Sequence, residues 1–311
     1  MEGSQKLLLM KIQQQSKIER LVQESIKTGK PLLSKVQKKV LAQKDEPEII
    51  EIPEVVRPPV VIERPPTIRS TGGLKIAFCL FGIIGGRQGK DGLGGDADFA
   101  RCFDTYNDRI FKLYDTDVFL HTWSVQYEKP IIKLYQPKGA IFEPQIMFDG
   151  GKGPNRGDRF RSMSRWYSTM KVLELQRQYS ERHNIHYDFI MLTRFDIMWL
   201  VPLNFEKLER DCFYIANWNL HKSSGLRGNA SFPHGKMKRY SDMWMIGSQE
   251  QMNHLSGLYN VIGQIGNHEF DQHALLFTRM AKYREMNCIR FKYLNSIDYA
   301  LYRKHVLGCT I

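Results

Sequence analysis

The sequence predicts an α/β fold in which helices flank a mostly parallel central sheet. Five consecutive residues, Phe189 to Thr193, are apolar or β-branched and show no helical period, as expected of a strand buried on both faces. Apolar runs at 74–82 and 115–123 predict two more buried strands. Helical segments separate these runs, and a strand-helix-strand order with crossovers of this length implies parallel pairing.

Helical periodicity fills the intervals between these strands. Aromatic and aliphatic residues recur every three or four positions in 97–114 and in 158–184, which predicts two core-facing helices. Short strands are predicted at 131–135 and 140–142. Three arginines crowd the first two turns of the second helix: Arg159, Arg161 and Arg165. Because cations are unfavourable near a helix N-terminus, we expect an anion or nearby acidic side chains to compensate them.

The composition is that of a globular protein, since 42% of the 311 residues are hydrophobic and 12% are aromatic. No segment approaches the roughly 20 apolar residues that span a bilayer. The apolar patch at 7–10 is followed at once by Lys11, so no signal peptide is predicted and a cytoplasmic setting is expected. Five scattered cysteines without a Cys-x-x-Cys pair predict reduced thiols rather than disulfides or a structural zinc site.

Three parts are predicted along the chain. Residues 1–44 hold ten basic residues against three acidic ones and predict a basic amphipathic helical arm. Six prolines in 45–73 force extended backbone and predict a semi-rigid, acidic linker. The folded domain is expected to occupy 74–311. Two interpretations of the arm stay open, namely contact with a membrane surface or a partner protein, and a loosely ordered basic extension.

The predicted strand at 187–196 ends in a cation and a carboxylate, Arg194 and Asp196. Ligands of open α/β sheets collect outside the carboxyl ends of the strands, so this polar end is a candidate site. An Asp there could hold a hard cation through oxygen, and an Arg beside it could bind phosphate. The alternative is an ion pair on the surface that caps the strand.

Other candidate residues follow the remaining strands. A glycine-rich turn after the first strand places Arg87 where it could contact phosphate, although Ile84 and Asp91 break the Walker A pattern and a flexible surface loop is equally compatible. His121 ends the second strand as a ligand contact or as a structural histidine. Two polar segments, 150–157 and 217–238, are predicted as a lid and an acceptor-binding loop.

Several segments then form a recognisable ordered set. They are 75–82 followed by a loop with Arg87, 114–123, Ser162-Met163-x-x-x-Tyr167, 187–196 with Arg194-Phe195-Asp196, and 242–248. This set resembles a family of small GT-A-like, Rossmann-related glycosyltransferases of bacteria and of large DNA viruses of algae and amoebae. The resemblance covers residues 75 to about 280. The Asp-x-Asp typical of GT-A enzymes appears here as Arg194-x-Asp196.

The resemblance implies transfer of a sugar from a UDP-, GDP- or dTDP-sugar to a hydroxyl of a glycan or glycoprotein. It implies Mn²⁺ or Mg²⁺ on Asp196, which would neutralise the departing diphosphate together with Arg194 or Arg87. Asp242, just ahead of a predicted strand, becomes the candidate base of an inverting reaction, with a turn or cap residue as the alternative. Donor-binding positions carried over are Phe81, Gly82, Arg87, His121, Trp123, Arg194 and Asp196. For a viral chain, the expected setting is the host cytoplasm or the virion.

Two other function classes compete with the transferase. The formal charge of +12 and the pI of about 9.4 suit a nucleic-acid-binding protein. The basic residues lack interleaved glycine and aromatic patterns, however, and much of the excess charge lies in 1–44, so nucleic acid is the less expected partner. The third class is a scaffold protein that docks through the arm and linker and keeps an inactive transferase domain.

Overall fold

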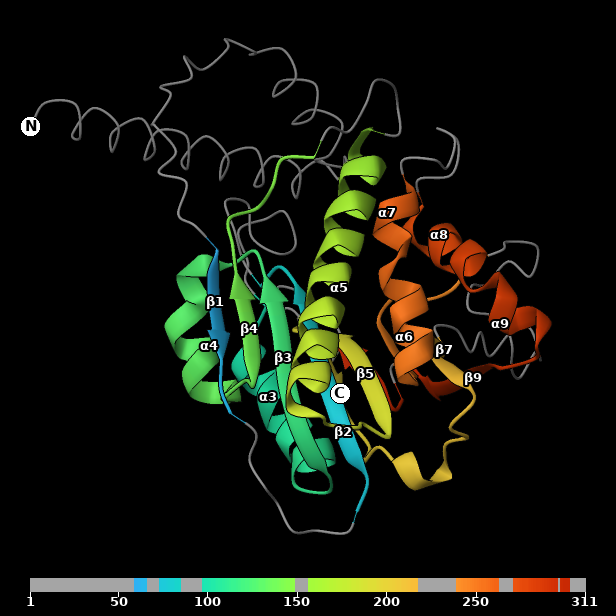
Figure 1. The fold of residues 1–311 in the computed structure, drawn as a ribbon, viewed down its shortest axis with the longest axis horizontal. Coiled ribbons are helices and arrows are strands. Elements are labelled where there is room, and N and C mark those ends of the chain that lie inside the picture. Colours follow the sequence, from blue (N-terminus) through green and yellow to red (C-terminus); the bar gives the residue numbers. More distant parts are fainter. Residues whose placement is uncertain are drawn as a thin grey trace, which may run out of the picture. The chain divides into compact units, whose positions relative to one another are not determined.

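The computed structural model describes residues 59–65, 73–84, 97–148, 156–217, 239–262, 271–295 and 297–302. These residues form an α/β fold around an eight-stranded sheet (Figure 1). Its parallel centre has the order β4 (Gly139–Phe142), β3 (Asp115–Thr122), β2 (Lys75–Gly82) and β5 (Phe189–Arg194). The predicted α/β class and the parallel pairing around the 187–196 strand are therefore confirmed.

Both sides of this centre are extended by further strands. Beyond β5 the sheet continues with β8 (Trp244–Gly247), β7 (Phe213–Asn217) and β9 (Ile289–Leu294). Here β8 is antiparallel to both neighbours, whereas β7 and β9 are parallel. At the other edge, β1 (Val60–Glu63) pairs antiparallel with β4, although these residues lie within the predicted linker. An edge position accommodates the prolines that flank this strand.

Helices cover both faces of the sheet. The long α5 (Arg156–His183) crosses β2 and β3, and α6 to α9 lie beside it (Figure 1). The helices of that group are α6 (Gln249–Ser256), α7 (Leu258–Ile262), α8 (Gln272–Arg279) and α9 (Ala281–Glu285). The opposite face carries α3 (Phe99–Tyr106), a π-helical turn (Asn107–Phe111) and α4 (Glu128–Tyr135).

The central strands are buried on both faces, which explains their continuous apolar sequences. In β2, Phe78 and Leu80 pack with α3 and α4, whereas Cys79 and Phe81 pack with α5. The same alternation holds along β5. Two-sided burial removes the polar half of the usual alternating strand pattern.

The residues directly after Asp196 form one strand of a two-stranded sheet. It consists of β6 (Ile197–Trp199) and β10 (Tyr299–Leu301), paired antiparallel. Trp199 packs against Trp244 and Tyr299, and the Asp196 carbonyl accepts a hydrogen bond from the Tyr302 amide at 2.8 Å. This packing fixes the turn that presents Asp196 next to the end of β5.

One predicted strand is wrong, because residues 131–135 belong to α4. The buried Ile131 and Tyr135 lie four positions apart on one helical face, a relation that a five-residue apolar window does not distinguish from a strand. Pro130 falls in the first turn of the helix, where proline is tolerated. The remaining short helical segments are Val125–Tyr127 and Phe205–Lys207.

Several sequence predictions lie outside the described residues. They are the arm at 1–44, most of the linker, Arg87 and most of the segments predicted as lid and acceptor loop. Within the described ranges, none of the helices combines the length and apolar character needed to cross a membrane. The four cysteines in these ranges, Cys79, Cys102, Cys212 and Cys288, form no disulfide with one another.

Candidate functional site

Strand register brings three predicted site residues into one row at the carboxyl ends of the parallel strands. Phe81 of β2 lies opposite His121 of β3 on one side and opposite Arg194 of β5 on the other. Helix α5 packs over this row, with the Arg165 guanidinium 3.7 Å from the centroid of the Phe81 ring. The predicted location, the carboxyl edge of the sheet, is therefore where these side chains meet.

A chain of hydrogen bonds links β2 to β4 through α5. The Gly82 amide donates to Ser168 Oγ at 2.9 Å, and Ser168 Oγ lies 2.7 Å from His121 Nδ1. On its other side, His121 Nε2 lies 2.7 Å from Glu143 Oε1. Because an ionised carboxylate only accepts, Nε2 carries the proton and Nδ1 accepts from the serine hydroxyl. Gly82 has a φ of +101°, a conformation that favours glycine.

Complete burial controls the protonation of this chain. His121 has no solvent exposure, and burial lowers its pKa below the ordinary value of 6.5, although the hydrogen bond to Glu143 opposes the shift. Burial acts to raise the pKa of Glu143, but the bond to His121 and nearby charges leave it below its ordinary value. His121 is therefore neutral at neutral pH and Glu143 is ionised.

This arrangement predicts a loss of stability in mild acid. The unfolded chain protonates His121 as the pH falls through about 6.5, before the folded chain does, so the free energy of unfolding decreases below that pH. His121→Gln keeps a donor for Glu143 and an acceptor for Ser168 but removes the titration. Chemical denaturation at about pH 7.5 and about pH 5.5 should show a smaller decrease for this variant than for the wild type.

The exposed His186 provides the matched control. His186→Gln should retain the wild-type pH dependence, because the His186 side chain is exposed and takes no part in the buried hydrogen-bond chain. Equal pH dependence of the wild type and His121→Gln would contradict the neutral, buried state of His121.

Trp123, just after β3, places its aromatic ring next to His121. Its ring stacks on Tyr167 of α5 with a centroid distance of 5.2 Å and an interplanar angle of 24°. Phe148 and Tyr259 pack edge-on or tilted against Tyr167. The Trp123 side chain is buried, and its indole N–H has no hydrogen-bond partner among the described residues.

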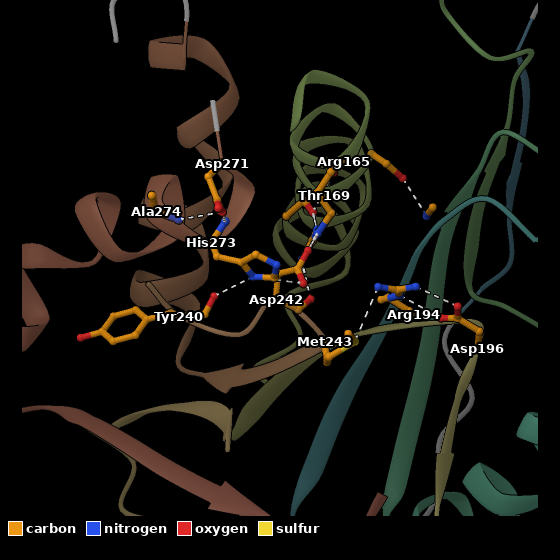
Figure 2. Close-up of polar contacts among 12 residues, drawn as sticks. Arg165, Thr169, Arg194, Asp196, Tyr240, Asp242, Met243, Asp271, His273 and Ala274 are labelled. Carbon is orange, nitrogen blue, oxygen red and sulfur yellow. Dashed lines mark hydrogen bonds and ion pairs between the residues drawn. The ribbon is translucent and has the colours of Figure 1, made fainter. Parts of the chain in front are cut away.

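The second half of the site is a buried ion pair between α5 and the segment before β8. Arg165 Nε donates to Asp242 Oδ2 at 3.0 Å, and Nη2 donates to the Asp242 carbonyl at 3.0 Å. Nη1 donates to the Thr169 hydroxyl, so every nitrogen of this guanidinium has a partner (Figure 2). Burial lowers the pKa of Arg165 to about 10, which keeps it charged at neutral pH. The expected acidic compensation of the α5 arginines is thus found for Arg165.

One carboxylate oxygen of Asp242 lacks a hydrogen bond among the described residues. The residue is 1% exposed, and Oδ1 has no hydrogen-bond partner within the described ranges. His273 Nδ1, at the start of α8, is 3.6 Å from it but donates to the Tyr240 carbonyl at 3.0 Å (Figure 2). Burial acts to raise the pKa of Asp242, yet His273, Arg165 and Arg194 hold it below its ordinary value of 3.8. Asp242 is therefore ionised, and its Oδ1 faces His273 but has no hydrogen bond within the described ranges.

Arg194 and Asp196 form a close two-point pair at the end of β5. Nε donates to Oδ1 and Nη2 donates to Oδ2, each at 2.8 Å (Figure 2). The pair caps the strand, as in the alternative interpretation, but it is buried rather than on the surface, since Asp196 is fully buried and the Arg194 side chain is 13% exposed. Among the described residues, the remaining nitrogen, Nη1, has the Met243 sulfur as its contact, at 3.6 Å.

The residues at this site do not fit a divalent metal as they are placed. Asp196, the predicted ligand, gives both oxygens to Arg194, and Asp242 gives one to Arg165. No group of three or more His, Cys, Asp or Glu side chains suited to a metal occurs in the part of the chain that the structure describes. Binding Mn²⁺ or Mg²⁺ at Asp196 stays a prediction, and it requires the pair with Arg194 to open.

A separate cavity of about 720 Å³ lies near the amino ends of β3 and β4. Its lining includes Thr116 and Asp117 at the start of β3, together with Arg64 and Lys138. Asp117 is engaged by Tyr187 and Lys75. None of the predicted site residues contributes to this lining. The polar cluster at the carboxyl edge, and not this cavity, is the candidate site.

The sequence indicated one residue of most of these contacts but not the residue that it pairs with. Glu143, Ser168, Thr169 and His273 were not among the predicted site residues. Glu143 directly follows β4, so the rule that selected Arg194 at the end of β5 would also have selected it. Ser168 and His273 carry no comparable local signal.

Comparison of the sequence with models of known protein families gives no match, and comparison with curated proteins gives none either. The candidate site therefore stands on its own residues and geometry.

Proposed function

We propose that this protein is a glycosyltransferase that moves a sugar from a nucleotide-sugar donor to a hydroxyl of a glycan or glycoprotein acceptor. The donor class is a UDP-, GDP- or dTDP-sugar. The GT-A-like character of the sheet, a cytoplasmic setting and a docking role for residues 1–44 belong to the same proposal. Nucleic acid is not the proposed partner, because much of the basic excess lies in 1–44, outside the folded domain.

The observation that carries the proposal is the unengaged oxygen of Asp242. A buried carboxylate that is ionised and lacks a donor on one oxygen suits the acceptance of a proton from a bound hydroxyl. Arg165 fixes the direction of the carboxylate through its hydrogen bonds to Oδ2 and to the Asp242 carbonyl. A purely structural carboxylate at this depth would be expected to have both oxygens satisfied.

The proposed step is a direct displacement at the anomeric carbon. The acceptor hydroxyl gives its proton to Asp242 Oδ1, and its oxygen forms the new bond to the anomeric carbon. The bond from that carbon to the phosphate oxygen breaks, and the nucleoside diphosphate leaves with the electron pair. Arg194, whose charge also helps to lower the pKa of Asp242, would stabilise the charge that develops on the diphosphate.

The partly exposed Tyr167 ring, stacked on the buried Trp123, is the proposed contact for a flat ring of the donor. The indole N–H of Trp123, which has no partner among the described residues, would donate a hydrogen bond to a polar atom of the donor ring. The chain from Gly82 to Glu143 holds His121 against Trp123, since the two rings meet edge to face at 4.8 Å. His121 therefore has a positioning role in the proposal.

Donor binding and turnover test the proposal together. We expect one of UDP-, GDP- or dTDP-sugars to raise the melting temperature, because a ligand that binds only the folded state stabilises it by about 2.7 kcal/mol at 100 times its dissociation constant. The same donor should release its nucleoside diphosphate on incubation with the full chain. Sugars without the nucleotide serve as controls.

Absence of both binding and release across this panel would overturn the transferase proposal. Binding without release, unchanged by Asp242→Asn, would instead favour the scaffold function, in which the domain recognises a sugar nucleotide but performs no chemistry.

A further inference from the structure

Arg194 keeps hydrogen-bonding capacity that its protein partners do not use. A guanidinium carries five N–H groups in a planar fork. Two of them bind Asp196, and within the described part of the chain Nη1 meets the Met243 thioether, a weak acceptor, at 3.6 Å. The side chain is also 13% exposed, whereas its partner Asp196 is fully buried. The guanidinium is thus held from one side and open to a ligand oxygen on another.

The neighbouring charges favour an anion over a cation at this place. Arg165 lies close enough to Arg194 for the two guanidiniums to influence each other, as the lowered pKa of Arg165 reflects, with burial as its main cause. A divalent ion at Asp196 would face Arg194 at contact distance, since that guanidinium is 2.8 Å from both carboxylate oxygens. A phosphate oxygen would gain a charge-assisted hydrogen bond from the same group.

We infer, building on the proposed function, that Arg194 binds the diphosphate of the donor directly and that this binding needs no divalent ion held by the protein. Asp196 then acts as the counter-ion that fixes the direction of the guanidinium. The Arg194-x-Asp196 sequence is in this view an anion-binding element. Asp242 remains free for the proton, because no metal competes for its Oδ1.

Equilibrium binding of UDP, GDP and dTDP to the full chain tests the inference without any turnover. Titration calorimetry is run once in excess EDTA and once with Mn²⁺. We expect one nucleotide to bind with dissociation constants that agree within about threefold between the two conditions, a difference below 1 kcal/mol. Binding that appears only with Mn²⁺ would overturn the inference and leave the transferase proposal standing. Absence of binding in both conditions would overturn both.

Arg194→Lys tests whether anion binding needs the planar guanidinium or only a positive charge. Lysine keeps a cation next to Asp196 but loses the planar second edge, so the dissociation constant in EDTA should rise by at least about tenfold. Arg210→Lys is the matched control, because Arg210 is exposed and pairs with Asp188, at the opposite end of the sheet. Unchanged affinity in Arg194→Lys would contradict the assignment. Should that variant not fold, the comparison of EDTA with Mn²⁺ on the wild type still decides.

Discussion

Asp242→Ala is expected to lower the free energy of unfolding by about 3 to 5 kcal/mol, the range for breaking one partner of a buried ion pair. The substitution leaves the Arg165 guanidinium buried beneath α5 with the Thr169 hydroxyl and a backbone carbonyl as its remaining acceptors. The buried guanidinium charge is then desolvated but has no counter-ion, which destabilises the folded state. Urea denaturation at neutral pH measures the difference.

A double variant separates the ion pair from the space that it fills. Arg165→Met with Asp242→Leu removes both charges, and the free energy of unfolding should return to within about 2 kcal/mol of the wild type, because a buried pair contributes little net stability over apolar residues of similar volume. A loss below about 1 kcal/mol for Asp242→Ala alone would show that Arg165 does not depend on this carboxylate.

The sequence was sufficient for the elements that repeat a simple pattern. The apolar run in β5 and the period of α5 are properties of the chain itself, and both elements form close to the predicted residues. The polar end of β5 also lies at the carboxyl edge of a parallel sheet, where a ligand site was expected. These predictions needed only local spacing and the rule that parallel strands end at one edge.

Partner choice was not accessible in the same way. Arg165 and Asp242 are 77 positions apart, and Ser168 and His121 are 47 apart. Spacing along the chain does not indicate which of three arginines on α5 meets a carboxylate, because the packing of α5 on the sheet decides it. Sequence spacing left Asp196 open as a metal ligand or as an ion-pair partner, and in the folded chain both of its oxygens accept hydrogen bonds from Arg194.

The edge strand β1 shows how tertiary contacts override a composition signal. Its residues lie among prolines that predict a linker, and in isolation they have little reason to form a strand. Pairing with β4 over four residues supplies backbone hydrogen bonds, and the alternate residues Val60 and Ile62 pack against the core. Composition identified extended backbone correctly but did not identify its partner.

Asp242→Asn is expected to slow sugar transfer by a factor of about 100 to 10,000, the usual contribution of a positioned general base. The amide has nearly the shape of the carboxylate, so its oxygen can still accept from Arg165, but it cannot take a proton from the acceptor hydroxyl. The donor should bind almost as before, because the proposed donor contacts are Arg194, Trp123 and Tyr167. Ser241→Ala changes the residue directly before Asp242 and serves as a control for a general effect of substitution on local packing.

The most direct test is therefore the single-turnover rate of nucleoside diphosphate release by Asp242→Asn at saturating donor and acceptor, with donor affinity measured on the same sample. The proposed function predicts a rate at least about 100-fold below the wild type and a donor dissociation constant within about threefold of it. A rate within about threefold of the wild type would show that the unengaged oxygen of Asp242 does not take the proton.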